Sequence, residues 1–228
     1  MRDPQHGPLP LPLVLLTMVT GLVDAVSYLA LGRVFVANMT GNVVFLGFAA
    51  VGAGDFSVLA SLAAILAFLL GAVAGGRLAN WLGAHRGKLL ATAILIETLL
   101  VGLSLCLVLG KIAHAPFEQY LLIAALAIAM GMQNAAARRL AVPDLTTTVL
   151  TLTLTGFAAE SALAGGKSPR TERRVIATVS MFAGAALGAL LLLNVGTGAV
   201  LAVVLVLLLT ALAMAMPYWW ATEAWTQG

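Results

Sequence analysis

Charged side chains are scarce in this chain: only 9% of its 228 residues are Asp, Glu, Lys or Arg, while 61% are hydrophobic. Soluble domains carry about 25% charge, and a soluble fold with so few polar groups could not cover its surface. The composition therefore excludes an ordinary soluble domain and predicts an all-α, polytopic membrane protein within a lipid bilayer. The net charge of +3 is spread over loops, so no nucleic-acid partner is expected.

Cysteine and histidine are nearly absent as well. Cys106 is alone, which excludes an internal disulfide and any multi-cysteine metal site. The three histidines, His6, His85 and His114, fall in terminal or loop positions, and no HExxH string occurs. We therefore expect neither a bound metal nor a cofactor.

Long apolar runs fill the remainder of the sequence. Eight can be drawn, at roughly 11–31, 34–50, 56–81, 88–110, 117–140, 145–163, 175–194 and 197–216. A straight transmembrane helix needs about 20 apolar residues. The second run is too short for this and the sixth is rich in threonine, so these two are the doubtful spans.

The basic residues test whether all eight runs cross. If they did, the twelve Lys and Arg residues would divide evenly between the two sides. If the second and sixth runs enter and return on the same side, only Arg33 and Lys111 lie on one side and the rest on the other. Such a bias marks the cytoplasmic side. The sequence thus predicts six full spans plus two re-entrant or broken helices, with both termini inside. An even division would also fit a dual-topology protein, and Arg138 and Arg139 could instead line a pore.

Two short motifs recur half a chain apart. Residues 21–25 (GLVDA) match residues 131–135 (GMQNA), and residues 71–75 (GAVAG) match residues 184–188 (GAALG). The last two are GxxxG steps, which let helix backbones approach closely. With three crossings in each half, we expect an inverted repeat with halves at about 11–110 and 117–216 in one membrane domain, 1–228.

The polar strings also resemble those of a known family. Its first signature is similar to residues 21–28 and 34–42, and its second to residues 131–135, 138–139 and 146–151. On these residues the chain resembles the YoaK family of bacterial inner-membrane proteins, over about residues 13–216. The resemblance implies a multi-pass protein of the bacterial plasma (inner) membrane. It implies no catalytic residues, because the family has no known function.

Asp24 is the first candidate for a functional residue. It lies thirteen residues beyond Leu11, about 20 Å along the first helix, within the hydrocarbon region. A carboxylate there needs a partner, water or a proton. It either couples transport to a proton or cation, or bonds structurally to Thr40, Asn42 or a basic group. Its counterpart Asn134 cannot titrate.

Glu97 is the second intramembrane carboxyl group and the sole charge between Lys88 and Lys111. We expect it to face the bundle interior and to form a buried ion pair with Arg138 or Arg139. The alternative is that Glu97 binds substrate or a proton. The two arginines could equally anchor their helix at the interface or bind an anion.

Neutral polar residues of the two re-entrant segments complete the candidate site. We expect those of the first segment to face those of the second across an uncharged constriction that contacts substrate. They are Asn38, Thr40, Gly41 and Asn42 in the first segment and Thr147, Thr148 and Thr151 in the second. The alternative is that the threonines bond only their own helix and pack against neighbours.

These features favour a secondary transporter or channel-like carrier of a small polar solute, with a small solute or a proton as its partner. A structural or regulatory subunit of a membrane complex, or a homo-oligomer, would use the small-residue helix faces instead. An intramembrane enzyme is the third possibility. We expect no enzyme, because no GxSxG string occurs and no histidine falls in an apolar run.

Overall fold

The computed structural model of the chain describes residues 6–82, 85–110, 115–145, 147, 150–166 and 171–226. Six helices of these residues are long and apolar enough to cross a membrane. They are α1 (Pro10–Ala30), α3 (Val58–Trp81), α4 (Arg86–Gly110), α5 (Ala115–Leu140), α7 (Thr171–Asn194) and α8 (Thr197–Ala215). At 1.5 Å per residue, each is about 30 to 40 Å long, which matches a bilayer core of about 30 Å. The predicted all-α membrane bundle with six full spans is confirmed.

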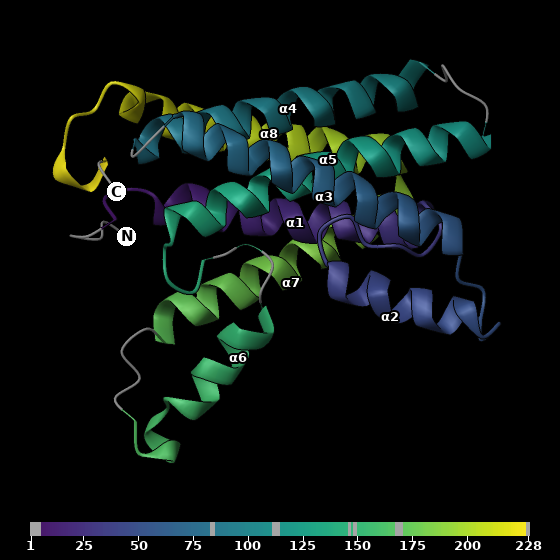
Figure 1. Ribbon diagram of the computed structural model, residues 1–228, viewed down its shortest axis with the longest axis horizontal. Coiled ribbons are helices and arrows are strands. Elements are labelled where there is room, and N and C mark those ends of the chain that lie inside the picture. The colour runs from purple at the N-terminus through teal and green to yellow at the C-terminus, as the bar shows by residue number, and fades with distance from the viewer. Residues whose placement is uncertain are drawn as a thin grey trace.

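Two shorter helices lie between the spans of each half. They are α2 (Met39–Ala50, 12 residues) and α6 (Leu150–Ala159, 10 residues), only about 18 and 15 Å long. Figure 1 shows α2 beside one end of the bundle, whereas α6 points away from it. Short 3-10 turns occur at η1 (Ala162–Ala164), η2 (Met216–Trp219) and η3 (Ala224–Thr226).

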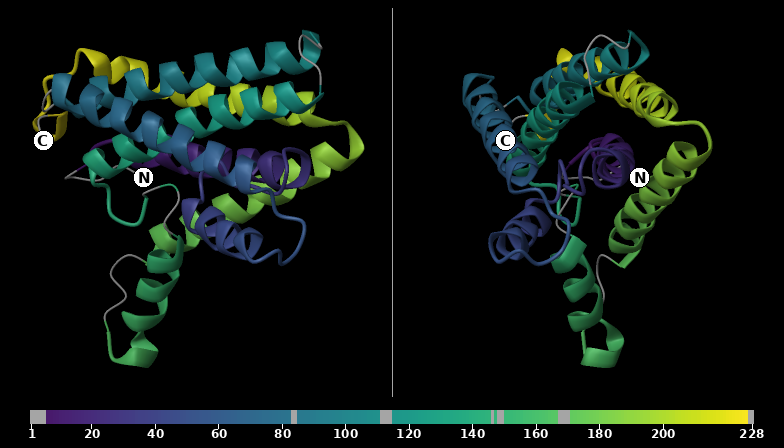
Figure 2. Two further views of the ribbon diagram at one scale, coloured as in Figure 1. Left: turned by 45° about the vertical axis from the view of Figure 1, so that its right-hand side comes forward. Right: turned by 90° about the vertical axis from the view of Figure 1, so that its right-hand side faces the viewer.

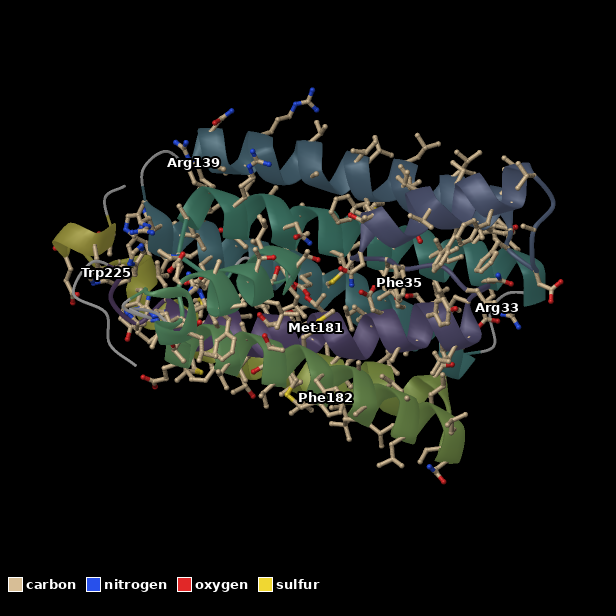
Figure 3. The ribbon with its side chains drawn as sticks, turned by 90° about the horizontal axis from the view of Figure 1, so that it is seen from below. Arg33, Phe35, Arg139, Met181, Phe182 and Trp225 are labelled. Atoms are coloured by element: carbon tan, nitrogen blue, oxygen red, sulfur yellow. The ribbon has the colours of Figure 1, made fainter. Side chains whose placement is uncertain are left out.

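Both chain ends lie at one end of the bundle (Figure 1). Figure 3 places Arg139 and Trp225 at that end and Arg33 at the other. This is the division that the basic residues predicted for six crossings. The end with Arg139 and the termini is therefore the one expected to face the cytoplasm.

The helices pair reciprocally between the two halves of the chain. α1 packs along α7, and α3 packs along α5, while α4 contacts α5 and α1 contacts α8. The first helix of each half thus lies against the third helix of the other half: α1 against α7, and α5 against α3. α1 and α5 occupy the middle of the bundle (Figure 2). In each of them 61% of the most apolar 18-residue stretch is buried, against 17 to 33% in the other four spans.

Glycines of the recurring motifs lie at the crossing points of these pairs. A Cβ on Gly131 would sit 2.1 Å from the Phe68 carbonyl oxygen of α3, and one on Gly71 would sit 2.1 Å from that of Ile128 in α5. In the other pair, a Cβ on Gly184 would sit 2.1 Å from the Met18 carbonyl oxygen of α1. The backbones of each pair are therefore in direct contact, as the GxxxG steps predicted.

Labelling of single cysteines tests the topology. In a Cys106→Ser background we introduce a cysteine at Ala53, beyond α2, or at Gly165, beyond α6; both positions are exposed. A membrane-impermeant maleimide is expected to label the two positions from opposite sides of the membrane. A permeant maleimide, which should label both from either side, is the control. Labelling of both positions from the same side would contradict the six-span arrangement.

Candidate functional site

The first re-entrant segment is fastened to Asp24, which is 4% exposed. After α1, Gly32 with φ of +95° turns the chain back along the bundle. The Asp24 Oδ1 atom accepts hydrogen bonds from the backbone N–H groups of Val36 (3.1 Å) and Ala37 (3.0 Å). Its Oδ2 atom accepts one from the side-chain amide of Asn38. Asp24 therefore satisfies polar groups of a non-helical stretch that would otherwise be unpaired at this depth.

A second brace in this segment is Asn42, which is fully buried. Its side-chain oxygen accepts from the Phe35 N–H (2.8 Å), and its amide donates to the Phe35 carbonyl (2.6 Å). Gly41 lies against the ring of Phe35, where a Cβ would come within 2.7 Å. Thr40, in contrast, is exposed. Asn42 and Gly41 thus shape the segment, and Thr40 points away from its interior contacts.

A series of stacked aromatic rings also holds this segment, toward the end of the bundle. The ring of Tyr28 stacks on that of Phe35 with centroids 5.1 Å apart. Phe35 stacks on Phe45 at 5.7 Å, and Phe45 on Phe56 at 4.7 Å. The stack joins α1, the extended stretch, α2 and the loop before α3, so it holds the first re-entrant segment in one position.

A second polar cluster lies near the centre of the bundle. Its members are Glu97 of α4, Gln133 of α5, Thr20 of α1 and Thr147, each no more than 3% exposed. Both terminal atoms of the Gln133 side-chain amide contact the other three residues. One lies 2.8 and 3.1 Å from the two Glu97 carboxylate oxygens, and the other 2.9 Å from the Thr20 hydroxyl and 3.1 Å from that of Thr147.

The two clusters lie on consecutive turns of α1. Thr20 and Asp24 are four residues apart, which is about 6 Å along a helix and on the same face. The segment that bonds to Asp24 enters from the Arg33 end, and Thr147 follows α5 in from the opposite end. Two chain segments thus reach the same helix from opposite ends of the bundle. The buried polar face of α1 that they meet consists of Thr17, Thr20, Asp24 and Ser27.

Arg174, at the start of α7, holds the second re-entrant segment. It is 4% exposed and donates to Asp144 (3.1 Å), Glu160 (2.9 Å) and the Gly156 carbonyl oxygen (2.6 Å). Asp144 precedes α6, Gly156 lies within it and Glu160 follows it. Arg174 therefore ties the entry and the exit of this segment to one helix, by hydrogen bonds to charged groups.

The backbone before α6 is unusually strained. Ala141, Asp144 and Thr147 have φ values of +50°, +64° and +63°. Such a backbone costs a β-branched residue such as Thr147 about 1 to 3 kcal/mol. The strain lies at the residue whose hydroxyl touches Gln133, so this tip is held in place by its contacts rather than by local preference.

The predicted ion pair of Glu97 with Arg138 or Arg139 is wrong. Glu97 faces Gln133, and Arg138 and Arg139 are exposed at the end of α5, so the described residues show no ion pair among them. The arginines lie too far along α5, where they reach the surface. Asp144 bonds Arg174, and α6 begins only at Leu150.

The residues predicted to line one uncharged constriction lie in different places. Asn38 joins Asp24, and Thr147 joins the central cluster, but Thr151 is exposed on α6. Thr148 lies outside the described residues. Asn134 donates to the Met130 carbonyl oxygen of its own helix (2.8 Å).

Three residues of these clusters were not singled out from the sequence. Gln133 is polar within the GMQNA motif, and Thr20 is one turn before Asp24 in an apolar helix, so both carried a usable signal. Arg174 gave none, because it follows Arg173 in a basic stretch typical of a cytoplasmic loop. Within the described ranges, no group of three His, Cys, Asp or Glu residues could hold a metal ion.

Comparison with known proteins adds the family. The family described as "Protein of unknown function (DUF1275)" matches residues 12–214. The chain belongs to this family. It is similar to the UPF0700 transmembrane protein YoaK of Bacillus subtilis (strain 168), with 36% identity over 146 residues. That match covers 62% of this chain and 62% of the relative, less than two thirds of either. The resemblance predicted from the polar strings is confirmed. No solved structure matches the chain.

Proposed function

We propose that this multi-pass membrane protein is a secondary transporter or channel-like carrier of a small polar solute. One observation carries the proposal: two non-helical segments enter from opposite ends and meet buried polar groups on consecutive turns of α1. In membrane proteins, non-helical backbone at such depth is tolerated where protein or a water-filled cavity surrounds it. Broken helices that meet at mid-depth are typical of transporter binding sites.

The reciprocal helix pairing supports the inverted repeat on which such carriers depend. α1 runs parallel to α7, since Met18 lies beside Gly184 and Leu22 beside Gly188. α3 runs parallel to α5 in the same way, with Gly71 beside Ile128 and Gly75 beside Met132. Residues 21–25 thus pack against residues 184–188, and residues 131–135 pack against residues 71–75. The proposed location is the bacterial plasma membrane, with the Arg139 end in the cytoplasm.

A structural or regulatory subunit is the second candidate, favoured by α6. This helix points away from the bundle in both views of Figure 2. Its residues Leu152, Leu154 and Phe157 are 42 to 70% exposed and apolar. A subunit role predicts that a cysteine at Leu154 cross-links to a second polypeptide in native membranes while the purified protein carries no flux.

Solute flux tests the carrier. Purified protein is reconstituted in liposomes that hold a pH-sensitive dye and a pH gradient, and amino acids, sugars and organic ammonium ions are added one at a time. We expect at least one solute to dissipate the gradient faster than in protein-free liposomes. Thr147→Val, which removes the hydroxyl at the tip of the second segment, is expected to slow that flux at least tenfold.

The matched control is Gly76→Ala, because no atom lies within 4 Å of the Cβ that it would add. This variant should retain the flux. A folded protein without solute-dependent flux for any probe, or a Thr147→Val variant as fast as the parent, would count against the carrier.

A further inference from the structure

We infer that Glu97 binds and releases a proton, with the side-chain amide of Gln133 as its switching partner. Proton binding itself requires only the described geometry; its use to drive solute movement rests on the proposed carrier function. The site differs from the Asp24 position that the sequence favoured.

Among the described residues, no cation forms an ion pair with Glu97. Its carboxylate is 1% exposed, and its hydrogen-bond partner among the described residues is the neutral Gln133. α8 and η2 and η3, which also pack against α4, carry no charged residue. The charged or titratable residues on α4 and on the described elements around it are Asp24 and Tyr28 of α1, Arg77 of α3, Arg86, Lys88 and Cys106 of α4, Glu118, Tyr120, Arg138 and Arg139 of α5, and Tyr218 of η2. None forms an ion pair with Glu97 in the part of the chain described.

Asp24 lies one turn of α1 beyond Thr20, and its surroundings contrast with those of Glu97. It accepts from two backbone N–H groups and one side-chain amide, so both of its oxygens have fixed hydrogen-bond donors. Glu97 has a single amide for both oxygens. An isolated charge in an apolar interior is costly, so Glu97 needs a proton from outside, whereas Asp24 is already served by fixed donors.

The Gln133 amide fits both protonation states. When Glu97 is ionised, the amide nitrogen faces the carboxylate and donates at 2.8 Å, and the amide oxygen accepts from Thr20 and Thr147. When Glu97 carries a proton, its O–H donates to the amide oxygen in the same place. The amide nitrogen then donates to Thr20 (2.9 Å), and Thr20 in turn donates to the Leu16 carbonyl oxygen (2.9 Å). A 2.8 Å separation is normal for an O–H···O bond, so neither state requires displacement of the backbone.

The switch reaches the second re-entrant segment through Thr147. In the ionised state the Thr147 hydroxyl must donate to Gln133; in the protonated state it can only accept from it or turn away. Thr147 has a strained backbone with φ of +63°, so this one contact helps to hold the tip. Protonation of Glu97 therefore changes the bonding of the segment that the carrier would move. The proton comes from water at one face and returns to water at release, and no other covalent bond forms or breaks.

Infrared difference spectroscopy tests the site in the full-length protein reconstituted in lipid. Spectra are recorded between acidic and alkaline buffer, without any solute. We expect a reversible carbonyl stretch of a buried protonated carboxyl group that is missing from the Glu97→Gln spectrum, while the bands of the other carboxyl groups remain. That change imitates the protonated side chain and so keeps the fold. Glu118→Gln, at the start of α5, is the matched control and should keep the band.

A second variant and a change of salt complete the test. Gln133→Met removes the amide at similar length and is expected to shift the band frequency, because the carboxyl group loses its acceptor. The band should not change when Na⁺ replaces K⁺. A band that persists in Glu97→Gln, a carboxyl group that stays ionised throughout, or a band displaced by Na⁺ would each overturn the inference.

The outcomes separate the proton site from the carrier. A titrating Glu97 band in a protein without flux would leave the proton site standing and remove the carrier. Solute flux without the band would do the reverse. Where both hold, Glu97→Gln should abolish the dependence of flux on the pH gradient while solute still binds.

Discussion

Gly71→Ala and Gly184→Ala are each expected to lower the free energy of unfolding by about 2 to 3 kcal/mol, the usual cost of forcing extra atoms into a packed interior. The added Cβ would lie 2.1 Å from a carbonyl oxygen of the facing helix in both cases. Because that oxygen belongs to backbone, the helices must move apart. The loss of stability is measured by thermal unfolding in detergent, with size-exclusion chromatography as the readout. Leucine at either position should prevent recovery of monodisperse protein.

Gly76→Ala provides the internal comparison on the same helix as Gly71. It meets nothing within 4 Å, and alanine favours a helix over glycine by about 1 kcal/mol, so its stability should be equal or slightly higher. The same helix preference acts on Gly71→Ala, so any loss there understates the clash. Equal stability of the Gly71→Ala and Gly76→Ala proteins would show that the two backbones are not in contact.

Asp24→Leu is expected to cost at least about 3 kcal/mol of unfolding free energy. It leaves the N–H groups of Val36 and Ala37 and the amide of Asn38 without an acceptor, at about 1 to 3 kcal/mol for each unsatisfied buried group. The first re-entrant segment should detach from α1. A cysteine at Ala37, which is 3% exposed, should then react with a maleimide that does not label it in the parent.

Two comparisons isolate the cause in this experiment. Asp24→Asn keeps one acceptor oxygen but turns an amide toward the donors, so its loss should be smaller. Asp55→Leu removes a carboxylate whose side chain is 94% exposed and should change little. If Asp24→Leu unfolded at the same temperature as Asp55→Leu, the carboxylate would not be what holds the segment.

The sequence predicted the membrane-level organisation because those signals are local. Length and hydropathy mark each span, and the bias of basic residues excludes two of eight runs as crossings. The recurring glycines of residues 71–75 and 184–188 predicted close helix contact, which the structure confirms. They did not say which helix each would meet, since a GxxxG step specifies a surface and not its partner.

The central cluster could not be predicted in the same way. Glu97 was paired with Arg138 or Arg139 on charge alone, whereas rotation along α5 points Gln133 at it and carries both arginines to the surface. Arg174 looked like a loop charge because its partners, Asp144 and Glu160, lie 30 and 14 residues away. Contacts across helices depend on relative rotation and depth, which composition does not encode.

The aromatic stack from Tyr28 to Phe56 makes the two halves mechanically unequal. Aromatic rings, the Asn42 side chain and the Asp24 carboxylate hold the first re-entrant segment, whereas Arg174 and the contact of Thr147 with Gln133 hold the second. In the proposed carrier, the second segment would be the one that moves more easily. Motion in this protein should therefore begin at α6, toward the end where the chain starts and finishes.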